Sequence, residues 1–338
     1  MGVIRKSNSP WASPIVCARR ANGDLRLAID YREVNHASLP ATVHPIPIIE
    51  DLLDRLGKAR FFSVLDAKAG YHQMPMRKGE SEISAFIVPW GQYEWSDRTP
   101  FGLKGAGYSF QRMMTTILGE CNYTDALCYL DDILVWGSTW KEHISRLRRV
   151  LNKIRDAGLA LSPEKCKFGV TEVEYLGAVV SNGMLRISEQ RVQHLRNLPR
   201  PETVRQMRRA IGAFSYVQRW IPGMAETAKP LYNALEKDPY KKLKWTDPMV
   251  HAFEKLKAQI ANAAAMHLPD FEKTFVLVTD ASDVGTGAML ANRSSSGELL
   301  PIAFFHHTLT APEQRYNTTE KEMLAVVLAV KRFRMYLS

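Results

Sequence analysis

The most informative stretch of the chain is residues 126–136, which read ALCYLDDILVW. Two apolar runs with strand character flank Asp131 and Asp132, and this pattern predicts a β-hairpin with the acidic pair at its turn. Asp-Asp is a poor turn, because both central positions of the favoured type require φ > 0. Adjacent carboxylates also repel each other, so a divalent cation at the hairpin tip explains the pair better than turn chemistry does. Taken alone, the pair is also compatible with a solvated surface turn.

A third carboxylate is expected to join this pair. Residues 61–65 form the apolar run FFSVL, which is followed directly by Asp66. If this run is a strand antiparallel to the hairpin, the side chains of Asp66, Asp131 and Asp132 converge. Carboxylate oxygens are the ligands that Mg²⁺ prefers. Two Mg²⁺ ions about 3.5–4 Å apart can activate a primer 3′-hydroxyl and stabilise a pyrophosphate leaving group, so the three acids predict a two-metal site.

Composition and charge favour a folded chain with a polyanionic partner. The 338 residues allow two or three domains. The composition, with 46% hydrophobic and 24% charged residues, excludes a disordered or membrane-embedded chain. The net charge of +10 favours nucleic acid as the partner. Between residues 186 and 220, eight arginines face only two glutamates. We expect this helical region to contact a phosphate backbone, although a solvated helical face is the other reading.

The cysteines and the termini indicate the cellular context. The 4 cysteines form no CxxC pair, which predicts free thiols, a reducing compartment and no disulfides. The chain has no apolar run of about 18 residues and no signal-peptide core, so we expect an intracellular protein without a membrane partner. The helical pattern at the C-terminal end runs to Ser338 without a capping glycine or polar tail, and we expect the chain to be a piece of a longer protein.

Local patterns predict further elements along the chain. Hairpins are expected where Asn-Gly separates apolar runs, at 14–19 with 25–30 and at 173–179 with 184–187. Helical spacing is found at 48–56, 109–118, 140–157 and 188–232, and prolines 199, 201, 222 and 230 are expected to divide the last of these. A polar linker at 237–247 precedes an α/β segment that starts at 275.

Several motifs together resemble a known family. The motifs are DAKAGYHQ at 66–73, PFGL at 100–103 with FQR at 110–112, YLDD at 129–132 and YLG at 175–177. In order and spacing they resemble the motifs of retroelement reverse transcriptases, and above all those of the Gypsy-type long-terminal-repeat retrotransposon polyprotein. Upstream, SPWASP at 9–14 and RLAIDYREVN at 26–35 are similar to its fingers segment. Downstream, TDAS at 279–282 and TEKEMLAV at 319–326 are similar to its ribonuclease H segment.

The resemblance implies a multidomain α+β chain with the right-hand polymerase fold. Residues 1–180 would form the fingers and palm, and residues 181–236 the thumb. Residues 237–272 would be a connector, and residues 273–338 an RNase H-like α/β domain that is truncated at its C-terminal end. These boundaries come from the family and not from composition.

The resemblance also assigns roles to single residues. The acids that would bind two Mg²⁺ ions and catalyse transfer are Asp66, Asp131 and Asp132, with the Ala67 carbonyl as a further ligand. The residues that would bind the incoming nucleotide are Arg26 with Arg19 or Arg20 at the triphosphate, Tyr71 as the gate under the sugar, and Phe101 and Gly102 beside the nucleotide. Two alternatives stay open: Tyr71 as a core aromatic, and Arg26 paired with Asp24 or Asp30.

Two further groups complete the assignment. Leu176 and Gly177 would hold the primer end, while the basic helices would track the duplex by its backbone. Asp280 and Glu322 resemble two of the acids by which an RNase H cuts RNA in a hybrid. The family places further acids beyond the helix of Glu322, so we expect RNase H activity to be absent or incomplete in this chain.

Two functions from different classes are therefore open. The first is an RNA-directed DNA polymerase that uses Mg²⁺, dNTPs, an RNA template and a DNA primer, and that also binds RNA/DNA hybrids. The second is a degenerate retroelement-derived protein that binds nucleic acid without polymerising, because Gly107 and Tyr108 depart from the family pattern at the nucleotide pocket. The expected location is the cytoplasm, in a retroelement particle, or the nucleus. The sequence does not set the oligomeric state.

Overall fold

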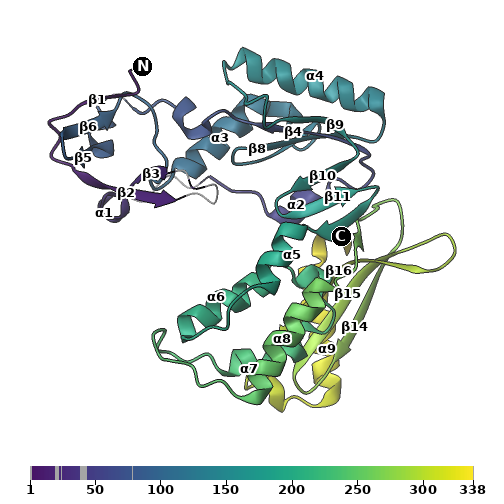
Figure 1. Cartoon of the computed structure of the whole chain (residues 1–338). Coiled ribbons are helices and arrows are strands. Elements are labelled where there is room, and N and C mark those ends of the chain that lie inside the picture. Colours follow the sequence, from purple (N-terminus) through teal and green to yellow (C-terminus); the bar gives the residue numbers. More distant parts are fainter. Residues whose placement is uncertain (1, 20–22, 24, 39–43, 78, 338) are drawn as a thin grey trace. The chain divides into compact units, whose positions relative to one another are not determined.

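The computed structural model describes residues 2–19, 23, 25–38, 44–77 and 79–337 (Figure 1). The chain divides into two compact units. The first unit contains Met1–Leu52 and Arg60–Thr171, and the second contains Leu53–Ala59 and Glu172–Ser338. Each unit has its own sheets and helices and is described by itself.

A five-stranded sheet opens the first unit. Its strands are ordered β1-β6-β5-β2-β3 and comprise β1 (Ile4–Lys6), β2 (Ser13–Arg19), β3 (Leu25–Ile29), β5 (Phe86–Val88) and β6 (Gly91–Trp95). Strands β2 and β3 pair antiparallel, which confirms the expected hairpin. Residues 20–22 and 24 of its turn lie outside the described residues. The short helix α1 (Arg32–Ala37) follows β3.

A four-stranded antiparallel sheet carries the acidic hairpin. Its order is β7-β8-β4-β9, with β4 (Phe61–Asp66), β7 (Ala126–Tyr129), β8 (Asp132–Gly137) and β9 (Lys167–Val170). The expected strand that ends at Asp66 is therefore confirmed. The remaining elements of the unit are α3 (Ala106–Leu118), α4 (Trp140–Asp156) and the short 3₁₀ turns Gly70–Gln73, Ser81–Ser84 and Gly119–Cys121. Helix α2 (Ile49–Asp54) begins in the first unit, and its last two residues belong to the second.

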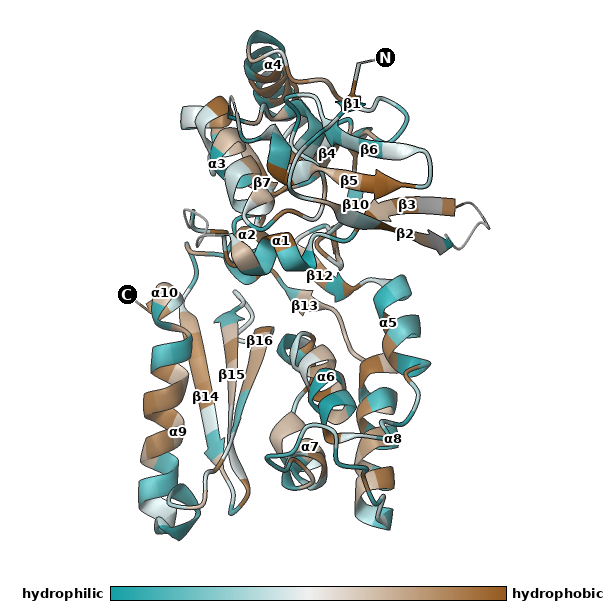
Figure 2. Cartoon of the chain, turned by 90° about the vertical axis from the view of Figure 1, so that its left-hand side faces the viewer, coloured by the Kyte–Doolittle hydropathy of each residue, from teal (hydrophilic) through white to brown (hydrophobic). Residues whose placement is uncertain are grey.

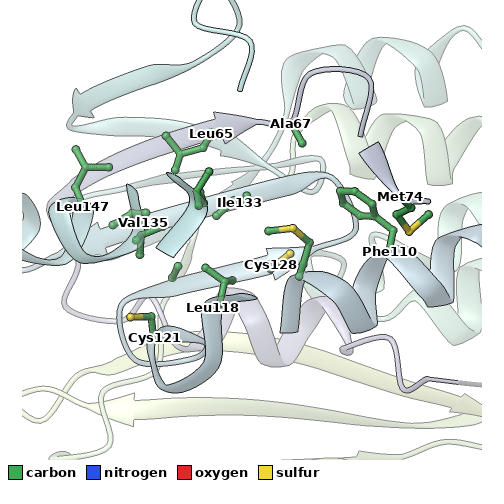
Figure 3. Packing of buried hydrophobic residues seen from close by; sticks show 14 residues of the cluster. Leu65, Ala67, Met74, Phe110, Leu118, Cys121, Cys128, Ile133, Val135 and Leu147 are labelled. Carbon is green, nitrogen blue, oxygen red and sulfur yellow. The ribbon is translucent and has the colours of Figure 1, made fainter. Parts of the chain in front are cut away.

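Helices α3 and α4 cover one face of this sheet and close its core. Phe110 and Met114 of α3, together with Val150 and Ile154 of α4, pack against side chains of β4, β7 and β8. Figure 3 shows this cluster, with Phe110 of α3 and Leu147 of α4 among its labelled side chains. The spacing of Val150 and Ile154 is helical, as the sequence predicts. Each large apolar side chain buried here contributes about 1.5–3 kcal/mol, so the strands beneath the acids are held firmly. The four cysteines are free thiols, as expected.

The second unit begins with a small antiparallel sheet in the order β10-β11-β12-β13. Its strands are β10 (Glu172–Tyr175), β11 (Ala178–Ser181), β12 (Met184–Ile187) and β13 (Met266–His267). The expected single strand over 173–179 is wrong, because Leu176 at φ +52° and Gly177 at φ +76° turn the chain between β10 and β11. The expected turn at Asn182-Gly183 is confirmed.

The middle of the second unit is helical. It contains α5 (Glu189–Arg196), α6 (Val204–Ser215), α7 (Met224–Asn233) and α8 (Asp247–Ala261), with a 3₁₀ turn at Gln218–Trp220. Two expectations fail here. Pro230 lies inside α7, where burial of Ala228 and Leu231 keeps the helix intact despite the lost N–H. Helix α8 lies within 237–272, where no helix was predicted, and it buries Phe253 and Leu256.

A three-stranded sheet, β14-β15-β16, ends the second unit. Strands β14 (Phe275–Ala281), β15 (Gly285–Arg293) and β16 (Leu299–Thr308) are antiparallel, which confirms the strand and hairpin expected from residue 275. After the 3₁₀ turn Glu313–Arg315, α9 (Thr318–Arg332) runs beside β14, and α10 (Arg334–Leu337) follows (Figure 2). None of the helices in the described part of the chain is long and apolar enough to cross a membrane.

Candidate active site

The hairpin tip differs from the sequence-based expectation by one residue. Tyr129 pairs with Asp132, so the two turn residues are Leu130 and Asp131, and Asp132 is the first residue of β8. Leu130 takes the left-handed conformation, with φ +54°. A leucine is strained there, because only glycine and, less often, asparagine or aspartate adopt this conformation readily. The surrounding structure must therefore hold the tip in place.

A buried glutamine holds this tip. Gln111 of α3 is 1% exposed, and both polar atoms of its side chain bind the hairpin backbone. Its Nε2 donates to the Cys128 carbonyl at 3.1 Å, and the Leu130 N–H donates to its Oε1 at 2.8 Å. From the sequence, Gln111 was noted only as part of the FQR motif at 110–112. The available signal was a polar residue on the apolar face between Phe110 and Met114.

The sheet brings the three acids into one electrostatic field. Asp66 ends β4 directly opposite Asp132, and Asp131 precedes Asp132 in the turn. Although Asp132 reaches the surface, partial burial and then the charges of Asp131 and Asp66 raise its pKa. The carboxylates therefore repel one another, and a cation bound among them would relieve the repulsion.

Two observations qualify the fit to a metal. The Lys165 Nζ lies 3.5 Å from an Asp66 carboxylate oxygen and partly neutralises it. Among the residues that the structure describes, no three His, Cys, Asp or Glu side chains form a ready metal cage. The fit to a hard cation therefore depends on the ligand chemistry and on the mutual repulsion of the acids.

Tyr71 stands beside the acids on an aromatic support. Its half-buried ring packs edge-on against Phe101, with centroids 5.1 Å apart, and against Phe110 at 5.4 Å. Burial, and then the charge of Asp131, raise the pKa of the Tyr71 hydroxyl. Phe101 is 43% exposed, so its ring remains available to a ligand while it supports Tyr71. The ring also packs against the buried core cluster of the first unit, so Tyr71 lies between that core and the exposed Phe101.

The loop after Phe101 is held from the opposite side by Asn35 of α1. The Asn35 Nδ2 donates to the Gly102 carbonyl at 2.8 Å, and its Oδ1 accepts from the Lys104 N–H at 2.6 Å. Gly102 has φ +94°, where a side chain would be strained. A Cβ on Gly107 would make ordinary contacts at 3.6 Å with Leu130 and at 3.7 Å with the Tyr71 hydroxyl, so the space around this position does not require glycine.

The arginines expected at the triphosphate are only partly described. Arg19 is exposed at the end of β2, opposite Leu25. The backbone of Arg26 pairs with Ala18 on the same hairpin, while the Arg26 side chain, like Arg20 and Asp24, lies outside the described residues. The other alternative partner of Arg26, Asp30, already binds Arg32 at 2.6 Å.

The residues expected at the primer end form a tight turn in the second unit. The Tyr216 hydroxyl donates to the Leu176 carbonyl at 2.7 Å, and the Ser188 N–H donates to the Gly177 carbonyl at 3.2 Å. Both carbonyl groups of the turn are therefore engaged by residues at or near α5 and α6. Leu176 and Gly177 are partly exposed, so the turn can contact a ligand.

The two RNase H-like acids lie on different elements of the second unit. Phe275 and Leu277 of β14 pack with α9 side chains, so strand alternation places Asp280 on the opposite face. On that face Asp280 lines a cavity with Val278, next to α7. Glu322 belongs to α9, and no described contact joins it to Asp280.

Comparison with known proteins identifies the family. Residues 4–180 match the family described as reverse transcriptase (RNA-dependent DNA polymerase). The chain belongs to the reverse transcriptase family. Residues 245–338 also match an RNase H-like domain found in reverse transcriptase. This match begins within the stretch expected as a connector.

Curated relatives of this reverse transcriptase chain are retrotransposon polyproteins, as the motif resemblance predicted. The chain is 38% identical over 344 residues to the retrovirus-related Pol polyprotein from transposon 297 of Drosophila melanogaster, covering 99% of the chain and 31% of the relative. It is 31% identical over 336 residues to the transposon Tf2-3 polyprotein of Schizosaccharomyces pombe, covering 99% of the chain and 25% of the relative. The chain thus spans about a third or less of these relatives.

Solved structures confirm the fold class of the reverse transcriptase chain. A foamy viral protease-reverse transcriptase, described as dRH and in complex with double-stranded DNA, matches with a TM-score of 0.87 at 24% identity, covering 99% of this chain and 58% of that one. A second foamy viral protease-reverse transcriptase, also with double-stranded DNA, matches with a TM-score of 0.84 at 24% identity, covering 100% of this chain and 70% of that one. At this identity the likeness shows the fold alone.

Proposed function

We propose that this chain is an RNA-directed DNA polymerase that adds deoxynucleotides to a primer 3′-hydroxyl. The observation that carries the proposal is the register of β4 with β8, which sets Asp66 opposite Asp132 and beside Asp131 in a member of the reverse transcriptase family. The intact acids argue against the alternative, a relic that binds nucleic acid without polymerising.

Asp66, Asp131 and Asp132 would hold two Mg²⁺ ions. Bound there, the ions supply activation of the 3′-hydroxyl and neutralisation of the pyrophosphate. The chain itself orients the reactants. Gln111 fixes the position of Asp131 by holding the turn, and the low dielectric constant of the sheet below strengthens the attraction between each carboxylate and a cation.

The nucleotide would lie against Tyr71 and the Phe101-Gly102 turn. An aromatic ring below the sugar crowds a 2′-hydroxyl and so selects deoxynucleotides over ribonucleotides. Arg19 and Arg26 would bind the triphosphate through their guanidinium groups. Leu176 and Gly177 would hold the primer end.

The expected partners are an RNA template, a DNA primer, RNA/DNA hybrid and dNTPs. The relatives support nucleic acid as the partner class, because foamy viral protease-reverse transcriptases have been solved with double-stranded DNA and with an RNA/DNA hybrid. The proposed division of the chain is fingers and palm at 1–180, thumb at 181–236, connector at 237–272 and RNase H-like domain at 273–338. An intracellular location fits the retrotransposon relatives.

The decisive experiment is primer extension on an RNA template with dNTPs and Mg²⁺. We expect extension by the wild type and none by Asp131→Asn. Salt-dependent duplex binding without any nucleotide incorporation by the folded wild type would favour the relic instead. In Tyr71→Val, ribonucleotide incorporation should rise, and an unchanged sugar preference would remove Tyr71 from the gate role.

We further propose that this chain does not cut RNA in a hybrid. The placement of Asp280 on the face of β14 away from α9, the helix that carries Glu322, supports this, because metal-assisted cleavage needs convergent carboxylates. A labelled RNA/DNA hybrid incubated with the purified chain and Mg²⁺ should stay intact. Release of RNA fragments that Asp280→Asn abolishes would refute the proposal.

A further inference from the structure

The turn expected at the primer end faces a half-buried arginine that the proposed reaction does not yet use. Arg191 of α5 stacks on the Tyr216 ring, with its guanidinium carbon 4.0 Å from the ring centroid. Its nitrogens approach the turn so closely that a Cβ on Gly177 would lie only 2.5 Å from one of them. Gly177 therefore has a second reason to be glycine besides its φ of +76°. The turn and the guanidinium are packed as one unit.

Arg191 carries a charge without a carboxylate partner. Within the described ranges Arg191 forms no ion pair, whereas Arg186 pairs with Glu172 and Arg200 with Glu254. The ring of Tyr216 holds the guanidinium by a cation–π contact, which leaves its N–H donors free to bind an anion. Tyr216 also donates to the Leu176 carbonyl, so the same tyrosine fixes both the arginine and the turn.

The surroundings are shaped for a ligand. An open hollow of about 570 Å³ is lined by Glu174, Gly177, Ser188, Gln190, Arg191 and His194, with Leu195 and Ala213 behind them. Both turn carbonyls already accept one hydrogen bond from the protein. Glu174 is the one carboxylate of the lining, and its charge opposes an anion.

We propose that Arg191 binds a backbone phosphate of the nucleic-acid duplex at the Leu176-Gly177 turn, and that Tyr216 is the positioning residue that holds both. This assignment rests on the proposed polymerase function, to which it adds a contact. A guanidinium suits phosphate because its N–H donors match two oxygens at once. A contact of this kind reads no sequence and sets the register of the duplex.

The first test measures duplex binding without catalysis. Fluorescence anisotropy of a labelled primer–template, with the wild type and Arg191→Met across a salt series, should show affinity about ten-fold lower for the variant at 0.1 M salt and a salt slope smaller by about 0.9. Arg196→Met, which removes an exposed arginine from the same helix, is the matched control and should change affinity less. Equal losses in both variants would show general electrostatics and overturn the proposal.

The second test neutralises one phosphate at a time on the nucleic acid, so a general loss of affinity in a variant cannot produce the expected pattern. Primers that carry one neutral methylphosphonate at successive positions should reveal a single linkage whose neutralisation weakens wild-type binding. Arg191→Met should be insensitive at that linkage. If the variant loses affinity there as the wild type does, Arg191 does not touch that phosphate and the proposal fails.

Further arms separate the roles and the ligand sources. Tyr216→Phe keeps the ring but loses the hydroxyl bond, so it should retain the binding affinity and lower the extension rate, whereas Tyr216→Ala should lower both. Glu174→Gln should strengthen duplex binding about two- to three-fold by removing a repulsive charge. A higher KM for dNTP in Arg191→Met with unchanged duplex affinity would place the nucleotide's phosphates there and overturn the proposal.

The outcomes for this contact and for the enzymatic function are distinguishable. A wild type that binds duplex through Arg191 but incorporates no nucleotide refutes polymerase activity and leaves the contact intact. A wild type that extends primers while Arg191→Met binds and extends normally refutes the contact and leaves the activity intact.

Discussion

Replacing Asp132 by asparagine should stabilise the first unit while it abolishes polymerisation. Burial and the charges of Asp131 and Asp66 raise the pKa of Asp132, so the ionised side chain is under repulsion in the folded state. Asparagine has nearly the same shape without the charge. In the wild type, the acids that polymerisation needs would therefore lower the stability of the folded state.

The size of the effect follows from the strand register. Asp66 lies directly opposite Asp132 in the antiparallel pair, where such side chains start from Cβ atoms about 5 Å apart. Two unit charges about 6 Å apart repel by about 3 kcal/mol at an effective dielectric constant of 20 and by about 0.7 kcal/mol in water. Because Asp132 reaches solvent, we expect about 1 kcal/mol, or about 2–4 °C in melting temperature for a unit of this size.

The pH dependence has a definite sign. A carboxyl with a raised folded-state pKa stabilises the fold below its unfolded value, and that stability is lost as pH rises through the folded-state pKa. The advantage of Asp132→Asn should therefore be absent near pH 3.5 and fully present at pH 7 in EDTA. Added Mg²⁺ should narrow the difference, since binding stabilises the wild type by RT ln(1 + [Mg²⁺]/Kd) and the variant by less.

The assay is thermal unfolding followed by circular dichroism, with and without Mg²⁺, alongside primer extension. Asp156→Asn removes an exposed carboxylate of α4 that pairs with Arg155, and it should change stability by less than about 0.5 kcal/mol. A melting temperature of Asp132→Asn at or below that of the wild type in EDTA at pH 7 would show that the acids do not repel one another as described.

Three further predictions concern buried polar groups. Gln111→Met should lower the free energy of unfolding in urea by about 2–4 kcal/mol, because two buried backbone groups lose their hydrogen-bond partner. It should also slow single-turnover extension without changing duplex affinity, and extension at the wild-type rate would contradict this. Asp54→Asn should cost about 3–5 kcal/mol, because it breaks the ion pair with Arg219, which is 2.6 Å long and whose side chains are 4% and 7% exposed. A loss below about 1 kcal/mol would exclude a buried ionised pair. Burial lowers the pKa of His143 from 6.5, so the free energy of unfolding should fall as pH decreases below about 6.5. This loss of stability should be smaller in His143→Asn than in the wild type. An equal dependence of stability on pH in both proteins would assign the loss to other groups.

The strongest local signals predicted their elements correctly. Helix α4 follows from apolar residues at helical spacing, and the β11–β12 hairpin follows from Asn182-Gly183, because these signals act over a few residues. Helix α8 was missed, since the lysines ahead of it indicated a linker and its apolar face becomes visible only when it packs. The Leu176-Gly177 turn was missed because a leucine with positive φ has no local signature.

The amino-acid sequence alone determined the family, the strand that ends at Asp66, the acidic hairpin and the arginine excess, because these depend on residue type and spacing along the chain. Only the tertiary structure decided which side chains meet. Register set Asp132 opposite Asp66, packing brought Gln111 under the tip and Arg191 against Gly177, and strand alternation placed Asp280 on the face of β14 away from α9. Such pairings join residues far apart in the chain, and their geometry is fixed by close packing between elements, which no local pattern encodes.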